Sequence, residues 1–151
     1  MDAPTCRPLS DMTAPIRVDR PRRLLLVNGC AQDRVVHMTF LRHHGMVVHG
    51  VAWPDTALRV LCAFRPEVIV TDLVFPRRHF DGLAFVSAVR QLRDIRDPVV
   101  VVLSDFTRHG DHRRARMVGA DSFLIKPCHP ERLLLEVRRA FYERQLLHVW
   151  H

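Results

Sequence analysis

Three side chains of complementary chemistry stand at the ends of three apolar runs that are far apart along the chain. They are the carboxylate of Asp72, the hydroxyl of Ser104 and the ammonium of Lys126. Apolar runs of this kind are typical of buried strands, and ligands bind outside the carboxyl ends of the strands of an open parallel sheet. The sequence therefore predicts one polar site that combines an acid, a hydroxyl group and a positive charge. Strands usually end in polar residues, so no single member of this set is informative alone.

Lys126 is the only lysine of the chain, which has 22 arginines. Arginine and lysine are interchangeable as solvated charges, but a tight site can require the compact ammonium group. A lone lysine at a strand end therefore favours a functional position over an ordinary exposed cation.

The elements that must position these residues follow from the apolar pattern. Runs that are apolar at every residue indicate strands buried on both faces, and amphipathic segments of helix length separate them. Five such βα units in series predict an α/β fold, a flavodoxin-like doubly wound parallel sheet with strand order 2-1-3-4-5. The expected strands contain residues 24–27, 46–48, 68–70, 99–103 and 123–125, and the expected helices are 33–44, 56–64, 83–92, 107–118 and 130–147. Gly45 and Gly119 fall where helix C-caps are expected.

The composition fits one folded domain. The chain has 151 residues, 48% of them hydrophobic, which suits a single domain with a real core. Residues 1–22 contain four prolines and are expected to be a flexible lead-in to a domain at residues 23–147, with residues 148–151 as a C-terminal tail. No run suits a membrane span or a secretory signal, and the four cysteines are scattered, so we expect a cytoplasmic protein with free thiols.

Three motifs, in this order, resemble the receiver domain of bacterial response regulators. Residues 68–73, with Asp81-Gly82 after them, resemble the acceptor strand and loop of that family. Residues 101–104 resemble its fourth strand, and residues 119–127 resemble its fifth strand with a Lys-Pro turn. Each motif is weak alone, but the ordered set across residues 23–147 is specific.

The resemblance implies a role for each matching residue. Asp72 would accept a phosphoryl group, Lys126 would pair with the phosphoryl oxygens, and Ser104 would hydrogen-bond the phosphorylated aspartate. Phe123 stands at the position of the family's switch aromatic, and the peptide bond before Pro127 is expected to be cis. These roles agree with the chemistry, because phosphoryl transfer needs positive charge on the equatorial oxygens.

The end of the first strand departs from the family, which usually has two acidic Mg²⁺ ligands there. This chain has Asn28 and Gly29, and Asp33 falls in the first turn of the next helix. The ligands that remain are Asp72, the backbone carbonyl of Val74 and Asn28, the last of these weakly through water. Because Mg²⁺ prefers carboxylate oxygens, we expect weak or absent Mg²⁺ binding.

The basic charge of the chain raises the question of an acidic or nucleic-acid partner. The formal net charge is +7, and a basic insert, Arg77-Arg78-His79, lengthens the loop after the acceptor strand. The arginines of the expected fourth helix, Arg113, Arg114 and Arg116, are interpreted as a solvated face. Aromatic residues are too scattered for base stacking, and the histidine spacing suggests no structural metal site.

The function that the resemblance implies is a stand-alone receiver module in two-component or phosphorelay signalling. Its phosphodonor would be a histidine kinase or a phosphotransfer protein. Its output would be contact with a protein target, or with a second copy in a homodimer, through the face built by the fourth helix, fifth strand and fifth helix. Two versions remain open, a working phosphoacceptor with a weakened metal site and a pseudo-receiver that binds partners without phosphorylation. Charge alone suggests a nucleic-acid-binding protein as a further alternative. An enzyme with an independent activity is not expected, because the sequence contains no second set of catalytic residues.

Overall fold

The predicted α/β fold and strand order are confirmed. The structure is a computed structural model, and it describes residues 21–76, 79–105 and 110–150. In this part of the chain, parallel strands form one sheet of order β2-β1-β3-β4-β5. The strands are β1 (Arg23–Val27), β2 (Val47–Val51), β3 (Val68–Asp72), β4 (Val99–Ser104) and β5 (Ser122–Ile125).

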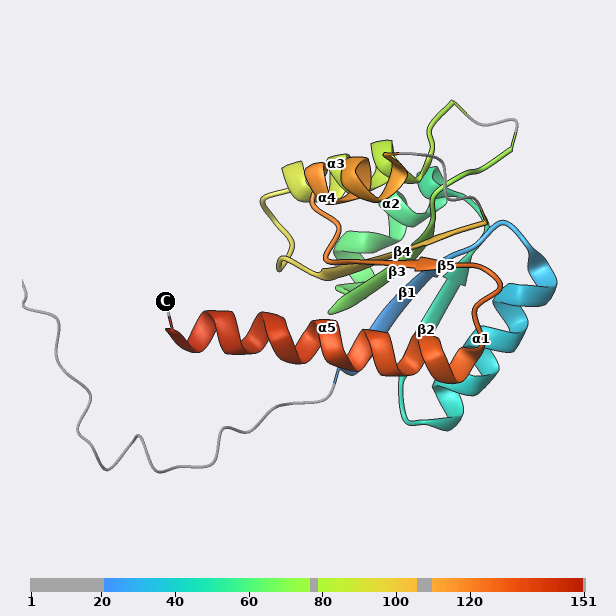
Figure 1. The fold of residues 1–151 in the computed structure, drawn as a ribbon, viewed down its shortest axis with the longest axis horizontal. Helices are drawn as coiled ribbons and strands as arrows, with labels where there is room; N and C mark the ends of the chain where they lie inside the picture. The colour runs from blue at the N-terminus through green and yellow to red at the C-terminus, as the bar shows by residue number, and fades with distance from the viewer. Residues whose placement is uncertain (1–20, 77–78, 106–109, 151) are drawn as a thin grey trace, which may run out of the picture.

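The helices cover both faces of the sheet, as Figure 1 shows. On one face lie α1 (Ala31–His43) and α5 (Pro130–Trp150), and on the other lie α2 (Pro54–Phe64), α3 (Gly82–Gln91) and α4 (Asp111–Met117). Each face has its own core, because successive strand residues point to opposite sides. Leu24 and Leu26 pack toward α1 and α5, whereas Leu25 and Val27 pack toward α2, α3 and α4. The strands are apolar throughout because both faces are buried.

Two helix ends differ from the expected ones by three residues or more, and the others by no more than two. α4 begins at Asp111 rather than Thr107, after Gly110 at φ 93°, and residues 106–109 lie outside the described residues. α5 continues past Leu147 to Trp150, so residues 148–150, expected as tail, are helical. Neither glycine nor proline interrupts that segment to end the helix. Across the described residues, no helix is long and apolar enough to span a bilayer.

The loop after β3 returns closely to the strand end. Asp81 caps α3, because its Oδ1 accepts a hydrogen bond from the Ala84 amide at 2.9 Å. The Gly82 amide donates to the Leu73 carbonyl at 2.9 Å, and a Cβ on Gly82 would lie 2.1 Å from the Asp72 carbonyl oxygen. Asp81-Gly82 therefore fixes the loop after β3 against that strand, while Arg77 and Arg78 of the insert lie outside the described residues.

Candidate functional site

The structure brings Asp72, Ser104 and Lys126 together at the carboxyl edge of the sheet. Asp72 and Ser104 end β3 and β4, and Lys126 directly follows β5. In the sheet register Asp72 lies opposite Leu103, and Ser104 lies opposite Ile125, so the three residues occupy neighbouring strand ends. The Lys126 Nζ lies 2.8 Å from the Asp72 Oδ1. A carboxylate, a hydroxyl and an ammonium group therefore share one site, as expected.

Burial and charge act against each other at this site. Asp72 is 6% exposed, and burial raises the pKa of its carboxyl group although the Lys126 hydrogen bond and charge lower it. Burial lowers the pKa of Lys126, but Asp72, Asp105 and Asp33 outweigh it, so the pKa of the ammonium group is raised. One ammonium group therefore lies among three carboxylates and stays protonated.

A pocket of about 240 Å³ lies beside Lys126. Asp33, His37 and Asp105 line it together with the turn from Lys126 to Cys128. Sequence reasoning placed Asp33 in the first turn of α1, where it lies, but did not bring it to the site, and it missed His37 and Asp105. The available signals were the spacing of four between Asp33 and His37, which puts both on one helix face, and the position of Asp105 directly after Ser104.

The end of β1 presents hydrogen-bond donors to the site. Asn28 is fully buried, its Oδ1 accepts the Cys30 amide at 2.8 Å, and its Nδ2 makes no hydrogen bond among the described residues. The Gly29 amide donates to the Asp72 Oδ2 at 3.1 Å. The Oδ2 of Asp72 thus accepts a backbone hydrogen bond, and its Oδ1 is ion-paired with Lys126.

This donor set does not suit a divalent cation. Among the described residues, no group of three histidine, cysteine or acidic side chains is arranged to hold a metal ion. The side-chain oxygen of Asn28 is already used by the Cys30 amide, and Gly29 has no side chain. Val74, whose carbonyl was the third expected ligand, lies two residues after Asp72 with its side chain 56% exposed. Of the acidic ligands that Mg²⁺ prefers, only Asp72 stands in its expected place.

The expected switch aromatic has an unforeseen neighbour. Phe123 is half-buried, and the imidazole of His112 on α4 stacks on its ring with the centroids 5.2 Å apart. The peptide bond between Lys126 and Pro127 is cis, as expected. The α4 helix therefore contacts the aromatic side chain of β5 directly.

Comparisons with known proteins agree with this geometry. The family model of the response regulator receiver domain matches residues 27–138. The chain is 31% identical over 108 residues to the transcriptional regulatory protein PdtaR of Mycobacterium tuberculosis, which covers 71% of this chain and 50% of that protein. It is 26% identical over 129 residues to the regulatory protein VirG of Agrobacterium fabrum, covering 85% of this chain and 49% of VirG. The chain thus spans about half the length of these curated relatives.

Among solved structures, the chemotaxis protein CheY4 of Vibrio cholerae has a TM-score of 0.73 at 27% identity, covering 80% of this chain and 99% of CheY4. NtrX of Brucella abortus has a TM-score of 0.77 at 22% identity, covering 85% of this chain and 28% of that chain, a likeness of fold alone.

Proposed function

The chain belongs to the response regulator receiver domain family, and from this premise we propose that it is a phosphoacceptor module of two-component signalling, with Asp72 as the acceptor. The observation that carries the proposal is the ion pair of Asp72 with the only lysine of the chain, at the strand ends that also hold Ser104. The phosphodonor would be a histidine kinase or a phosphotransfer protein.

The site residues divide the chemistry of the transfer between them. One oxygen of the Asp72 carboxylate attacks the phosphorus atom, the bond to the donor breaks, and the leaving group takes the electron pair. The Lys126 ammonium stands within hydrogen-bond distance of the acceptor and neutralises charge on the transferred oxygens. Ser104 is buried beside them, where its hydroxyl can hydrogen-bond the phosphorylated side chain.

A pseudo-receiver is the second candidate, and one observation favours it. The Gly29 amide already satisfies the Asp72 Oδ2, in a site whose first strand supplies no acidic ligand. In such a site the Asp72 carboxylate is already paired within the protein in the absence of a phosphoryl group. Partner binding would then be constitutive, because a ligand shifts a conformational equilibrium only through different affinities for the two states.

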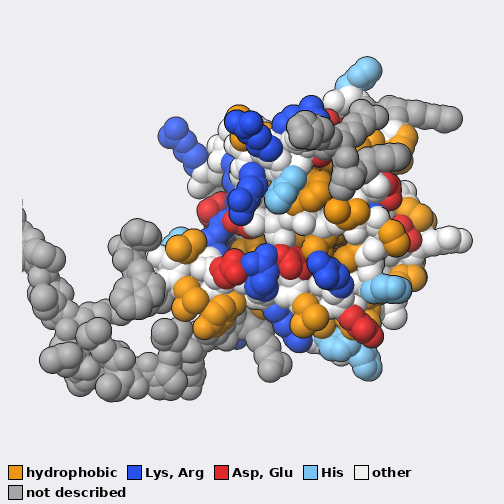
Figure 2. Space-filling view, viewed as in Figure 1, with side chains coloured by type: hydrophobic (Ala, Val, Ile, Leu, Met, Phe, Trp, Pro, Cys, Tyr) orange, Lys and Arg blue, Asp and Glu red, His pale blue; other side chains and the backbone are white. Residues whose placement is uncertain are grey.

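The proposed output surface is the face built by α4, β5 and α5. It exposes Met117 and Ile125, which are 76% and 54% exposed, and acidic and basic side chains alternate along α5 in Figure 2. Arg139 of α5 forms ion pairs with Glu136 and with Glu143, the latter at 2.7 Å, so it adds little net charge to this face. Exposed Arg113 and Arg116 on α4 and Arg138 on α5 give this face positive charge, which suits contact with an acidic protein surface.

Labelling with acetyl phosphate, followed by intact-mass measurement, tests the acceptor assignment. We expect one phosphoryl group on the wild-type protein and none on Asp72→Asn, because an amide is a far weaker nucleophile than a carboxylate. Asp94→Asn, which changes an exposed aspartate of the loop before β4, is the matched control and should label like the wild type. Failure of the wild-type protein to label would favour the pseudo-receiver.

A further inference from the structure

A buried amide donor without an acceptor lies at the end of β1, where the family places acidic metal ligands. Asn28 is 0% exposed, and its Nδ2 has no hydrogen-bond partner among the described residues. Leaving a buried amide group without a hydrogen bond is unfavourable. The orientation of the amide is fixed by the Cys30 amide, which needs the Asn28 oxygen as its acceptor at 2.8 Å. What this position lacks is therefore an acceptor, such as an anionic oxygen, and not a cation.

Further hydrogen-bond donors surround Asn28. The Gly29 amide points at Asp72, and the 13-residue helix α1 begins directly after Cys30, whose side chain does not cap it. A helix N-terminus presents free N–H groups and the positive end of the helix dipole. The Arg34 guanidinium donates to the Asn28 carbonyl at 2.7 Å and occupies the backbone oxygen of that residue. Asp33 in the first turn of α1 adds negative charge nearby, but the Asn28 Nδ2 and the Gly29 amide are themselves hydrogen-bond donors, which suit an anionic oxygen better than a divalent cation.

We propose that the phosphoryl group on Asp72 is held by the Asn28 side-chain amide, the Gly29 backbone amide and the Lys126 ammonium in place of a divalent cation. The inference rests on the proposed function, because it concerns the same phosphoacceptor. The bonds that form and break in the transfer are the same as they would be with a bound cation. A new bond forms between an Asp72 oxygen and phosphorus, and the leaving group departs with the electron pair of the broken bond. The amide donors bind oxygens whose negative charge a metal ion would otherwise neutralise.

The test compares phosphorylation by acetyl phosphate in Mg²⁺ and in excess EDTA, followed by intact-mass measurement. The wild-type protein should label at the same rate in both solutions. Asn28→Asp replaces the donor with a like charge, and should slow labelling in EDTA about ten- to hundred-fold, the range expected for loss of one hydrogen bond to a charged group. Mg²⁺ should restore much of that rate, because the new carboxylate is a metal ligand.

Gly29→Asp is a second variant in case the buried Asn28 change disturbs folding. A Cβ at Gly29 would meet nothing closer than the Phe75 Cδ1 at 3.8 Å, so the position has room for a side chain. The Gly29→Asp variant should also make labelling Mg²⁺-dependent. Gln91→Glu, an amide-to-acid change on an exposed residue of α3, is the charge-matched control and should behave like the wild type. Isothermal titration with Mg²⁺ provides a readout besides phosphorylation. It should show much tighter binding to the two acid variants than to the wild type.

The outcomes separate this inference from the proposed function. Labelling of the wild type only in Mg²⁺ would overturn the inference and leave Asp72 as the acceptor. Equal rates in EDTA for the wild type and both acid variants would overturn the role of Asn28 and Gly29. No labelling of the wild type under any condition would overturn the proposed function, and the inference with it.

Discussion

His37 is a buried titratable side chain beside the site, although it takes no part in the proposed transfer. It is 6% exposed and its Nδ1 has no hydrogen-bond partner among the described residues. Burial lowers the pKa of the imidazole from its usual 6.5, Asp33 on the same helix face raises it, and Lys126 lowers it further. The net shift is downward, so the folded protein favours the neutral imidazole.

This shift predicts a loss of stability in mild acid. Because the folded-state pKa of His37 lies below 6.5, the unfolded chain takes up the proton first as the pH falls. The stabilisation is complete above the unfolded-state pKa and is lost as the pH falls through the folded-state value, at no more than about 1.4 kcal/mol per pH unit. His37→Met should therefore flatten the pH dependence of the unfolding free energy just below neutrality, measured by urea denaturation. His43→Met, at an exposed position of the same helix, should keep the wild-type slope, and equal slopes in all three proteins would contradict the prediction.

The strand-end residues of the site could be predicted from the sequence, and its helical residues could not. Strand ends converge by topology, so the apolar runs alone placed Asp72 beside Lys126. A helix face is chosen by packing, and α1 does not follow its apolar pattern. It buries His37 while Val35 and Val36 are 60% and 54% exposed. The spacing of Asp33 and His37 puts both on one face of the helix, but it does not show that His37 on this face is buried.

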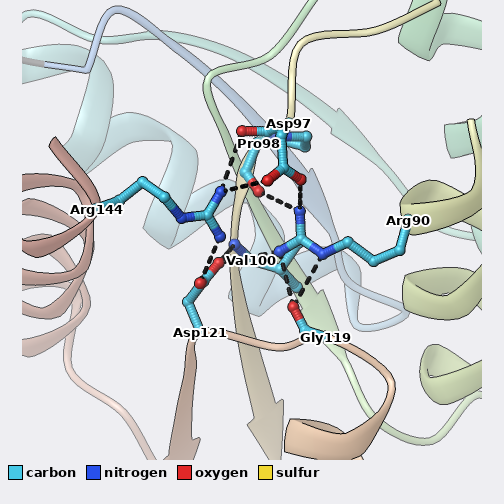
Figure 3. A network of polar contacts seen from close by, with 7 residues as sticks. All are labelled: Arg90, Asp97, Pro98, Val100, Gly119, Asp121 and Arg144. Atoms are coloured by element: carbon cyan, nitrogen blue, oxygen red, sulfur yellow. Dashed lines mark hydrogen bonds and ion pairs between the residues drawn. The ribbon is translucent and has the colours of Figure 1, made fainter. Parts of the chain in front are cut away.

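At the amino-terminal ends of β4 and β5, two arginines link helices α3 and α5 to the turns that precede these strands. Arg90 of α3 and Arg144 of α5 both form ion pairs with Asp97 and Asp121, which precede β4 and β5 (Figure 3). The Arg90 Nε also donates to the Gly119 carbonyl at 2.9 Å. Networks of partly buried charges hold geometry better than single surface pairs. This one fixes the turn between α4 and β5 against the neighbouring helices.

The turn makes Gly119 sensitive to substitution, and Gly45 offers a matched comparison. Both were expected at helix C-caps and directly follow the C-cap residues of α4 and α1, with φ of +109° and +87° respectively. A Cβ at Gly119 would lie 2.8 Å from the Arg90 Cγ, whereas one at Gly45 meets nothing within 4 Å. Gly45→Ala should lower the unfolding free energy by about 1 to 2 kcal/mol, from backbone strain alone. Gly119→Ala should lower it by about 2 to 4 kcal/mol, because Arg90 must also move. Urea denaturation measures the unfolding free energy of both variants. Equal losses of unfolding free energy would show that the Arg90 side chain moves aside without destabilising the protein.

Over the whole molecule, β4 and β5 connect the polar site to the proposed output surface. Ser104 ends β4, and its register with β5 places Phe123 opposite Val102 on the neighbouring strand. Phe123 in turn stacks on His112 of α4, a seven-residue helix that buries only Asp111 and Ala115. An element with few buried residues is the easiest to displace. The route that we expect from Ser104 to α4 runs from the Ser104–Ile125 pair along β5 to Phe123, and from there across the ring contact to His112.

This route predicts which parts of the protein change when Asp72 is phosphorylated. Amide resonances of β5 and α4 should shift when acetyl phosphate labels Asp72, because Ser104 turns toward the phosphoryl group and alters the packing of Phe123. Ser104→Ala should keep the labelling, measured by intact mass, but lose most of the amide shifts. The reason is that no hydroxyl remains to couple the phosphoryl group on Asp72 to the packing of Phe123. Ser87→Ala on α3 is the matched control and should retain them, and resonances of α2 should stay in place throughout. Full labelling without any shift in β5 or α4 would show that the face of α4, β5 and α5 does not report the state of Asp72, and that partner contact there is constitutive.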